Sequence, residues 1–194
     1  MLFIRHRINT AAELAAVPPG MGVELDLRSE GKRLILHHDP FQPGETFEDY
    51  LKAYHHGLMI VNVKAEGLEE PALELLEKYG VKNYFFLDLS FPALIKLATR
   101  GEPNIAVRFS EFEPLEQCLA LKGLVRWVWV DCFTNLPLTR VAYEKLAPHF
   151  KICLVSPELQ KHSLDRIAEF RHQLDGMKID AVCTKRPDLW QAAR

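Results

Sequence analysis

The residues best suited to chemistry lie near the start of the chain. Glu24 and Asp26 stand two positions apart in the segment 22–27, where apolar and acidic residues alternate. In a β-strand this alternation places both carboxylates on one face. Two such acids repel each other unless a cation joins them, and oxygen ligands suit Mg²⁺ or Ca²⁺. The segment therefore predicts a divalent-cation site. The alternative is a solvated rim in which the acids pair with basic residues: Arg7, Arg28 or Lys64.

Three histidines follow neighbouring expected strands, and at least one imidazole is expected close to the acidic pair. His6 ends the expected first strand, and His37 and His38 end a strand that the turn 29–32 folds back beside the acidic one. Neighbouring residues of a strand point to opposite faces, so only one of His37 and His38 can face the acids. Alternation alone does not say which one. Imidazoles beside carboxylates at strand ends indicate acid–base chemistry.

Short apolar runs alternate with helical patterns along the chain. Strands are expected at 1–5, 22–27, 59–64, 83–88, 104–109, 125–131, 151–155 and 179–183, with an additional hairpin strand at 33–37. Helices are expected to open at Thr46 and to span 68–80, 92–100, 113–122, 139–148 and 163–174, the last with Ser163 as N-cap. Eight strands alternating with helices predict an α/β protein, a compact (β/α)8 TIM barrel in one domain over residues 1–194. A flavodoxin-like open sheet would leave three strands unplaced.

A barrel enzyme builds its site at the carboxyl ends of its strands. The polar residues expected there, beyond the first forty positions, include Asn62, Lys64 and four candidate substrate contacts: Ser90, Arg108, Trp129 and Asp131. Trp127 and Trp129 share a strand face, which core packing explains equally well. His55 and His56 precede Gly57 at an expected helix end, where capping is a better explanation than catalysis.

Composition narrows the classes of partner. The 194 residues carry a formal net charge of -2 with both signs scattered, which does not favour nucleic-acid binding. No apolar run approaches the roughly 18 residues of a membrane span, and the N-terminus does not resemble a signal peptide. The four widely spaced cysteines predict buried free thiols, and with them a cytoplasmic location: Cys118, Cys132, Cys153 and Cys183.

Three stretches in this order resemble the glycerophosphodiester phosphodiesterase family, which belongs to the phosphatidylinositol-phospholipase-C-like barrels. They are IRHR at 4–7, VELDL at 23–27 and LHHD at 36–39. Weaker similarity continues through the helix that opens near Thr46, through 62–64, where the family has Glu-x-Lys, through 89–91, and through the closing strand and turn at 180–189. The likeness covers nearly the whole chain, and its first fifty residues are the specific part.

The resemblance implies roles for seven residues. His6 and His38 would be the general acid–base pair, with His38 chosen because it directly precedes Asp39. Glu24, Asp26 and Asn62 would bind the divalent cation, Mg²⁺ or Ca²⁺, while Arg7 and Lys64 would contact phosphate. The substrate would be a small phosphodiester with a glycerol-phosphate type of headgroup.

The chain departs from the family pattern in three places. Asn62 replaces a glutamate, Ile8 replaces a glycine, and the insertion after Asp39 that covers the glycerol end is nearly absent. These departures leave open a non-catalytic barrel that binds phosphates or sugar phosphates. A sugar-phosphate isomerase or aldolase, with Lys64 as a base or Schiff-base residue, is a third alternative.

Overall fold

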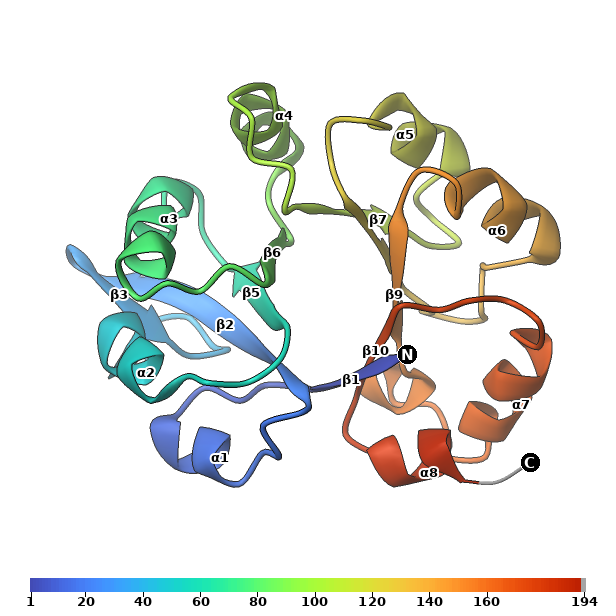
Figure 1. The fold of residues 1–194 in the computed structure, drawn as a ribbon, viewed down its shortest axis with the longest axis horizontal. Helices are drawn as coiled ribbons and strands as arrows, with labels where there is room; N and C mark the ends of the chain where they lie inside the picture. Colours follow the sequence, from blue (N-terminus) through green and yellow to red (C-terminus); the bar gives the residue numbers. More distant parts are fainter. Residues whose placement is uncertain (193–194) are drawn as a thin grey trace. The chain divides into compact units, whose positions relative to one another are not determined.

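The computed structural model describes residues 1–192 and shows a mixed α/β fold (Figure 1). By its internal contacts the chain divides into two compact units. The N-terminal unit comprises residues 5–105, and the C-terminal unit comprises residues 1–4 together with the chain from 106 onward. Each unit consists of a five-stranded sheet with helices in the connections between strands.

The sheet of the N-terminal unit positions the acidic segment. Its strand order is β4-β3-β2-β5-β6. The five strands are β2 (Gly22–Glu30), β3 (Arg33–Leu36), β4 (Glu45–Thr46), β5 (Met59–Val63) and β6 (Tyr84–Leu87). β5 runs parallel to β2 and to β6, whereas β3 folds back antiparallel to β2 as the hairpin partner expected from the sequence. In this register Asp26 lies directly opposite Asn62.

Four helices belong to this unit: α1 (Ala11–Ala15), α2 (Phe47–Ala53), α3 (Glu69–Lys78) and α4 (Phe91–Thr99). Thr46 is the N-cap of α2, as predicted, because its side chain accepts a hydrogen bond from the Asp49 N–H. The short α1 was not predicted. It begins with a capping box in which the Thr10 side chain accepts from the Glu13 N–H and Glu13 bonds back to the Thr10 N–H.

The C-terminal unit contains the second sheet, in the order β1-β10-β9-β8-β7. Its strands are β1 (Leu2–Arg5), β7 (Ala106–Phe109), β8 (Trp127–Val130), β9 (Lys151–Val155) and β10 (Ala181–Thr184). Its helical segments are α5 (Leu115–Ala120), α6 (Arg140–Leu146), η1 (Pro157–Gln160), α7 (Arg166–Gln173) and α8 (Pro187–Gln191). The prediction that Ser163 caps α7 is wrong, because the N-cap is Asp165. η1 and α8 were not predicted.

The strand interiors form the apolar core of each unit. All nine expected strands are present, and the parallel sheets predicted by their alternation with helices are confirmed. All four cysteines are buried free thiols, as predicted. All three tryptophans belong to the C-terminal unit and are buried: Trp127, Trp129 and Trp190.

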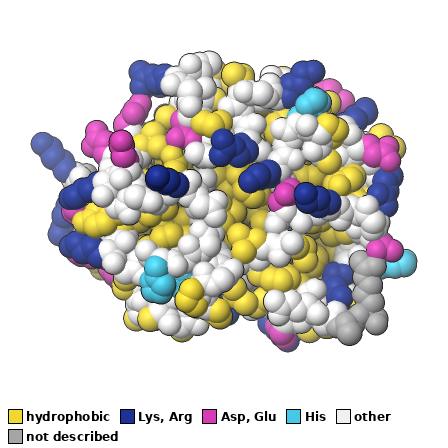
Figure 2. Space-filling view, in the orientation of Figure 1, with side chains coloured by type: hydrophobic (Ala, Val, Ile, Leu, Met, Phe, Trp, Pro, Cys, Tyr) yellow, Lys and Arg dark blue, Asp and Glu magenta, His cyan; other side chains and the backbone are white. Residues whose placement is uncertain are grey.

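The surface carries both signs of charge. On the face shown in Figure 2, Lys and Arg side chains are spread out, with Asp and Glu side chains between them. Among residues 1–192, no helix is both long and apolar enough to cross a bilayer.

The loop after β3 returns through a close backbone approach at Gly44. A Cβ added at Gly44 would overlap the carbonyl oxygen of Leu36, so only glycine fits there without a shift of the backbone. Gly20 makes a matched comparison, because a Cβ there would meet no heavy atom of the described residues within 4 Å.

Replacing Gly44 should therefore destabilise the protein. We expect Gly44→Ala to lower the free energy of unfolding by about 1–3 kcal/mol, as other overpacking changes do. Gly20→Ala should leave it within about 0.5 kcal/mol of wild type. Urea unfolding followed by circular dichroism measures both variants. Equal stability of the two variants would show that the loop relaxes without cost.

Candidate active site

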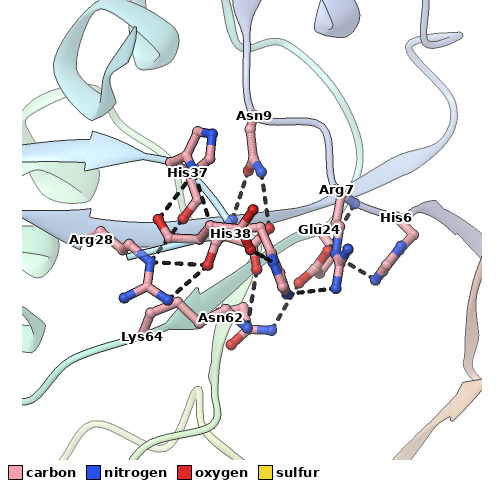
Figure 3. A network of polar contacts seen from close by, with 11 residues as sticks. His6, Arg7, Asn9, Glu24, Arg28, His37, His38, Asn62 and Lys64 are labelled. Atoms are coloured by element: carbon pink, nitrogen blue, oxygen red, sulfur yellow. Dashed lines mark hydrogen bonds and ion pairs between the residues drawn. The ribbon is translucent and has the colours of Figure 1, made fainter. Parts of the chain in front are cut away.

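The acidic pair lies inside the N-terminal unit. Glu24 is 1% exposed and Asp26 is 0% exposed, so the two carboxylates do not belong to a solvated rim. Both project from β2, which has a strand on either side in the sheet. Buried carboxylates require nearby hydrogen-bond donors or positive charge. The residues that supply them define the site (Figure 3).

Asp26 is held by one amide and one ammonium group. Asn9 donates from Nδ2 to Asp26 Oδ2 at 2.9 Å, while its own Oδ1 accepts the Asp26 N–H at 2.8 Å. Lys64 Nζ lies 3.0 Å from Asp26 Oδ1. Asn9 therefore ties the segment after β1 to β2 with two bonds, and Lys64 neutralises the carboxylate.

The donors around Glu24 compensate the burial of its charge less than those around Asp26 do. Asn62 Nδ2 donates to Glu24 Oε1 at 3.0 Å, and the Arg7 backbone N–H donates to Oε2 at 2.8 Å. His6 Nε2 lies 3.8 Å from Oε2. Burial, and then repulsion from Asp26, raise the pKa of Glu24 to about 7 despite these donors.

His38 lies between an acid and a guanidinium group. Its Nδ1 is 2.7 Å from Asp39 Oδ1, and its Nε2 is 2.6 Å from Arg7 Nη2. The hydrogen bond from His38 lowers the pKa of Asp39, which keeps that carboxylate ionised. Arg28 fixes the backbone beneath the ring, since its Nε and Nη2 donate to the His38 carbonyl at 3.0 and 2.7 Å. In Figure 3 the Arg7 side chain lies between His6 and His38.

An open cavity of about 760 Å³ adjoins His38. The segment after β1 lines one wall and the segment after β3 lines the other, with Arg7, Asn9, His37, His38 and Asp39 among the lining residues. His37 bonds through Nδ1 to the Asp39 backbone instead of to the acids. The volume of the cavity lies in the range of small-molecule sites, and Arg7 and two imidazoles line it.

The side chains around the acidic pair fit a hard divalent cation through oxygen donors. The two buried carboxylates are adjacent, and Asn62 Oδ1 is buried without a hydrogen-bond partner among residues 1–192. Within those residues no three His, Cys, Asp or Glu side chains form a candidate metal site. The third ligand would therefore be the Asn62 amide, and a neutral amide binds such an ion more weakly than a carboxylate does.

The remaining predicted contacts lie elsewhere in their own units. Ser90 accepts the Ala93 N–H and so caps α4. In the C-terminal unit Arg108 pairs with Asp131 at 2.5 Å, and Asp131 also accepts from Gln160 at 2.6 Å. Trp129 is 6% exposed, within the core. Their role as substrate contacts stays a prediction.

Two contributors to the site were not given their roles from the sequence. Asn9 holds Asp26, and Arg28, expected only as a possible partner of the acids, holds the His38 carbonyl; only Asn9 had a local signal, since it immediately precedes the Thr10–Glu13 capping box. Asp39, the neighbour by which His38 was chosen from the sequence, bonds the His38 ring. The capping prediction for the histidine pair is confirmed for His55, whose Nδ1 lies 2.9 Å from the Ala53 carbonyl at the end of α2.

Comparison with known proteins identifies a class of fold. No protein-family model matches the sequence, and no curated protein matches it. Solved structures of glycerophosphodiester phosphodiesterases share the fold, which confirms the sequence resemblance at that level. One, a glycerophosphodiester phosphodiesterase from Agrobacterium tumefaciens, has a TM-score of 0.72 and 15% identity, with 100% of each chain covered. Another, a glycerophosphoryl diester phosphodiesterase from Parabacteroides distasonis, has a TM-score of 0.67 and 13% identity over 97% of this chain and 84% of its own.

The buried Glu24 should make stability depend on pH. Its folded pKa of about 7 lies above the ordinary value of 4.5, so folding is favoured while it is protonated. As pH rises from about 4.5 through 7, wild type should lose about 3 kcal/mol relative to Glu24→Gln, which cannot ionise. Chemical unfolding in EDTA across this range measures the difference. The exposed Glu77 provides a control, and Glu77→Gln should track wild type. Parallel pH profiles for wild type and Glu24→Gln would contradict the assignment.

Proposed function

We propose that this protein is a phosphodiesterase of the glycerophosphodiester phosphodiesterase family, with its strands closed into a (β/α)8 barrel and with a small phosphodiester as substrate. The observation that carries the proposal is His38, whose ring is oriented by Asp39 and faces Arg7 at the edge of an open cavity. The likeness of the fold to solved phosphodiesterases supports it. An oriented imidazole next to a guanidinium group suits a reaction that moves a proton at an anionic phosphate.

The two histidines divide the proton transfers. His38, with Asp39 on Nδ1, removes the proton from the attacking water or substrate hydroxyl, whose oxygen then bonds to phosphorus. As the bond from phosphorus to the leaving alcohol breaks, His6 returns a proton to that alcohol. If a substrate hydroxyl attacks, the first product is a cyclic phosphate that water later opens. Arg7, with Lys64 beside Asp26, supplies positive charge for the phosphate oxygens.

Glu24, Asp26 and Asn62 are the proposed ligands of Mg²⁺ or Ca²⁺. A bound cation would neutralise the buried acids and add positive charge beside the phosphate. Two observations support this assignment: the pKa of Glu24 stays raised despite its hydrogen-bond donors, and the buried Oδ1 of Asn62 has no hydrogen-bond partner among residues 1–192.

The leaving alcohol is the least constrained part of the substrate. The connection between Asp39 and Gly44 is only a few residues long, and Phe41 within it is fully exposed instead of folded over the cavity. An open wall of this kind admits alcohols of different sizes. A panel of phosphodiesters assayed with Mg²⁺, Ca²⁺, Mn²⁺ and EDTA tests the activity and identifies the alcohol.

The roles proposed for the two histidines predict that the effect of each substitution on kcat depends differently on the leaving group. We expect His38→Ala to lower kcat by roughly 10²–10⁴-fold for both alkyl and p-nitrophenyl phosphodiesters, because both need a base. His6→Ala should lower kcat by a similar factor for alkyl esters but much less for p-nitrophenyl esters, whose leaving group needs no proton. His55→Ala is the control, since His55 bonds the end of α2, contacts the His56 ring and does not line the cavity. Full alkyl-ester activity in His6→Ala would refute the assignment.

Restoring a carboxylate at position 62 should strengthen cation binding. We expect Asn62→Glu to bind Mg²⁺ and Ca²⁺ roughly tenfold or more tightly than wild type, because ligand charge tunes the affinity of oxygen sites. Asn62→Ala should bind them more weakly. Isothermal titration calorimetry on EDTA-treated protein measures the affinities independently of turnover. Unchanged affinity in both variants would place the cation elsewhere.

A non-catalytic phosphate-binding protein is the second candidate. The observation in its favour is that internal donors already bond both acids: Asn62 on Glu24, and Lys64 with Asn9 on Asp26. Such a protein would bind a phosphodiester in calorimetry and release no product during long incubation. Measured turnover that His38→Ala abolishes would exclude it.

A further inference from the structure

We propose that Arg7 masks the catalytic nitrogen of His38 in the free protein, and that the phosphate of the substrate removes this mask. The inference rests on the proposed function for the identity of the ligand. The mask itself follows from contacts within the N-terminal unit.

The two neighbours of His38 fix its tautomer. The Asp39 carboxylate only accepts hydrogen bonds, so the ring nitrogen 2.7 Å away, Nδ1, carries the proton. A guanidinium group only donates, so the nitrogen 2.6 Å from Arg7 Nη2, Nε2, presents its lone pair. A proton on Nε2 would instead bring two donors into contact at that distance. In this arrangement His38 is a neutral imidazole with its lone pair engaged.

An engaged lone pair cannot accept a proton from a nucleophile. Arg7 therefore keeps His38 in the protonation state that a base needs and at the same time blocks the base. Activation requires only that Arg7 leave Nε2.

A phosphodiester is well suited to draw Arg7 away. Its two non-bridging oxygens, which share one negative charge, match the parallel N–H groups of a guanidinium group. Such charge-assisted bidentate bonds are stronger than one bond to a neutral imidazole. Arg7 is exposed and lines the cavity into which a substrate would enter. The ligand that needs the base is thus the ligand that frees it.

The histidine stays in place when the arginine moves. Asp39 holds Nδ1, and the half-buried Arg28 holds the His38 carbonyl through two hydrogen bonds. The Arg7 backbone is fixed separately, because its N–H bonds to Glu24. The displacement can therefore be confined to the Arg7 side chain. Arg28 is a positioning residue, and Arg7 both masks the base and binds phosphate.

Nitrogen NMR of the histidine rings tests the mask. In the full chain labelled with ¹⁵N-histidine, the His38 Nε2 resonance, assigned by its loss in His38→Gln, should move to higher frequency in Arg7→Gln because the bond to its lone pair is gone. Arg33→Gln is the matched control, since Arg33 lies in the same hairpin and pairs with Glu30. Its His38 signals should equal those of wild type. Equal Nε2 shifts in wild type and Arg7→Gln would overturn the mask.

Titration with dimethyl phosphate tests the displacement. Saturating wild type should move the Nε2 resonance away from its masked position, while Arg7→Gln should bind more weakly and change less. Binding in calorimetry without movement of the Nε2 resonance would overturn the displacement of Arg7 and leave the proposed function intact. Absence of binding would overturn both the displacement and the assignment of a phosphodiester as the ligand. Turnover of the ester panel is scored separately, so a moving resonance without any turnover would support the mask and refute the enzyme.

Discussion

The structure of the site depends on the burial of two like charges side by side. Glu24 and Asp26 are both buried on one strand, so neighbouring segments of the chain have to supply the hydrogen-bond donors that water would otherwise provide. Those donors come from the segment after β1, through Asn9 and the Arg7 backbone, and from the neighbouring strand, through Asn62 and Lys64. Segments far apart in sequence are thereby fixed to one another at the place where the chemistry is proposed.

The two buried carboxylates differ in the hydrogen-bond donors and positive charge that surround them. Asp26 has an ammonium and an amide group, whereas Glu24 has two neutral donors and an imidazole at 3.8 Å. Burial, and then the neighbouring Asp26, raise the pKa of Glu24 despite its donors. Where the family that the sequence resembles has a third acid, Asn62 supplies a donor to Glu24 and keeps a buried oxygen without a hydrogen-bond partner among residues 1–192, which the proposed cation would use. The residue at position 62 therefore decides how strongly the proposed cation would be bound.

Much of the fold was predictable because apolar periodicity is local. Each expected strand is present, and the alternation at 22–27 correctly placed Glu24 and Asp26 on one face. The same periodicity could not choose between His37 and His38, because the hairpin leaves regular β geometry there and hydrogen bonds to Asp39, Arg7 and Arg28 set the ring positions. Ser163 failed as an N-cap since a good capping residue does not fix where a helix starts. Contacts between distant segments, such as Asn9 with Asp26, have no signature in spacing.

The placement of the tryptophans gives the molecule two separate optical reporters. Trp127, Trp129 and Trp190 are buried in the C-terminal unit, whereas the acids and the proposed catalytic histidines belong to the N-terminal unit. Indole emission therefore follows the melting of the C-terminal unit. Tyrosine exposure, read by second-derivative absorbance, reports mainly on the N-terminal unit, which holds Tyr50, Tyr54, Tyr79 and Tyr84. Coincident transitions in the two signals would mean that both units unfold as a single cooperative body.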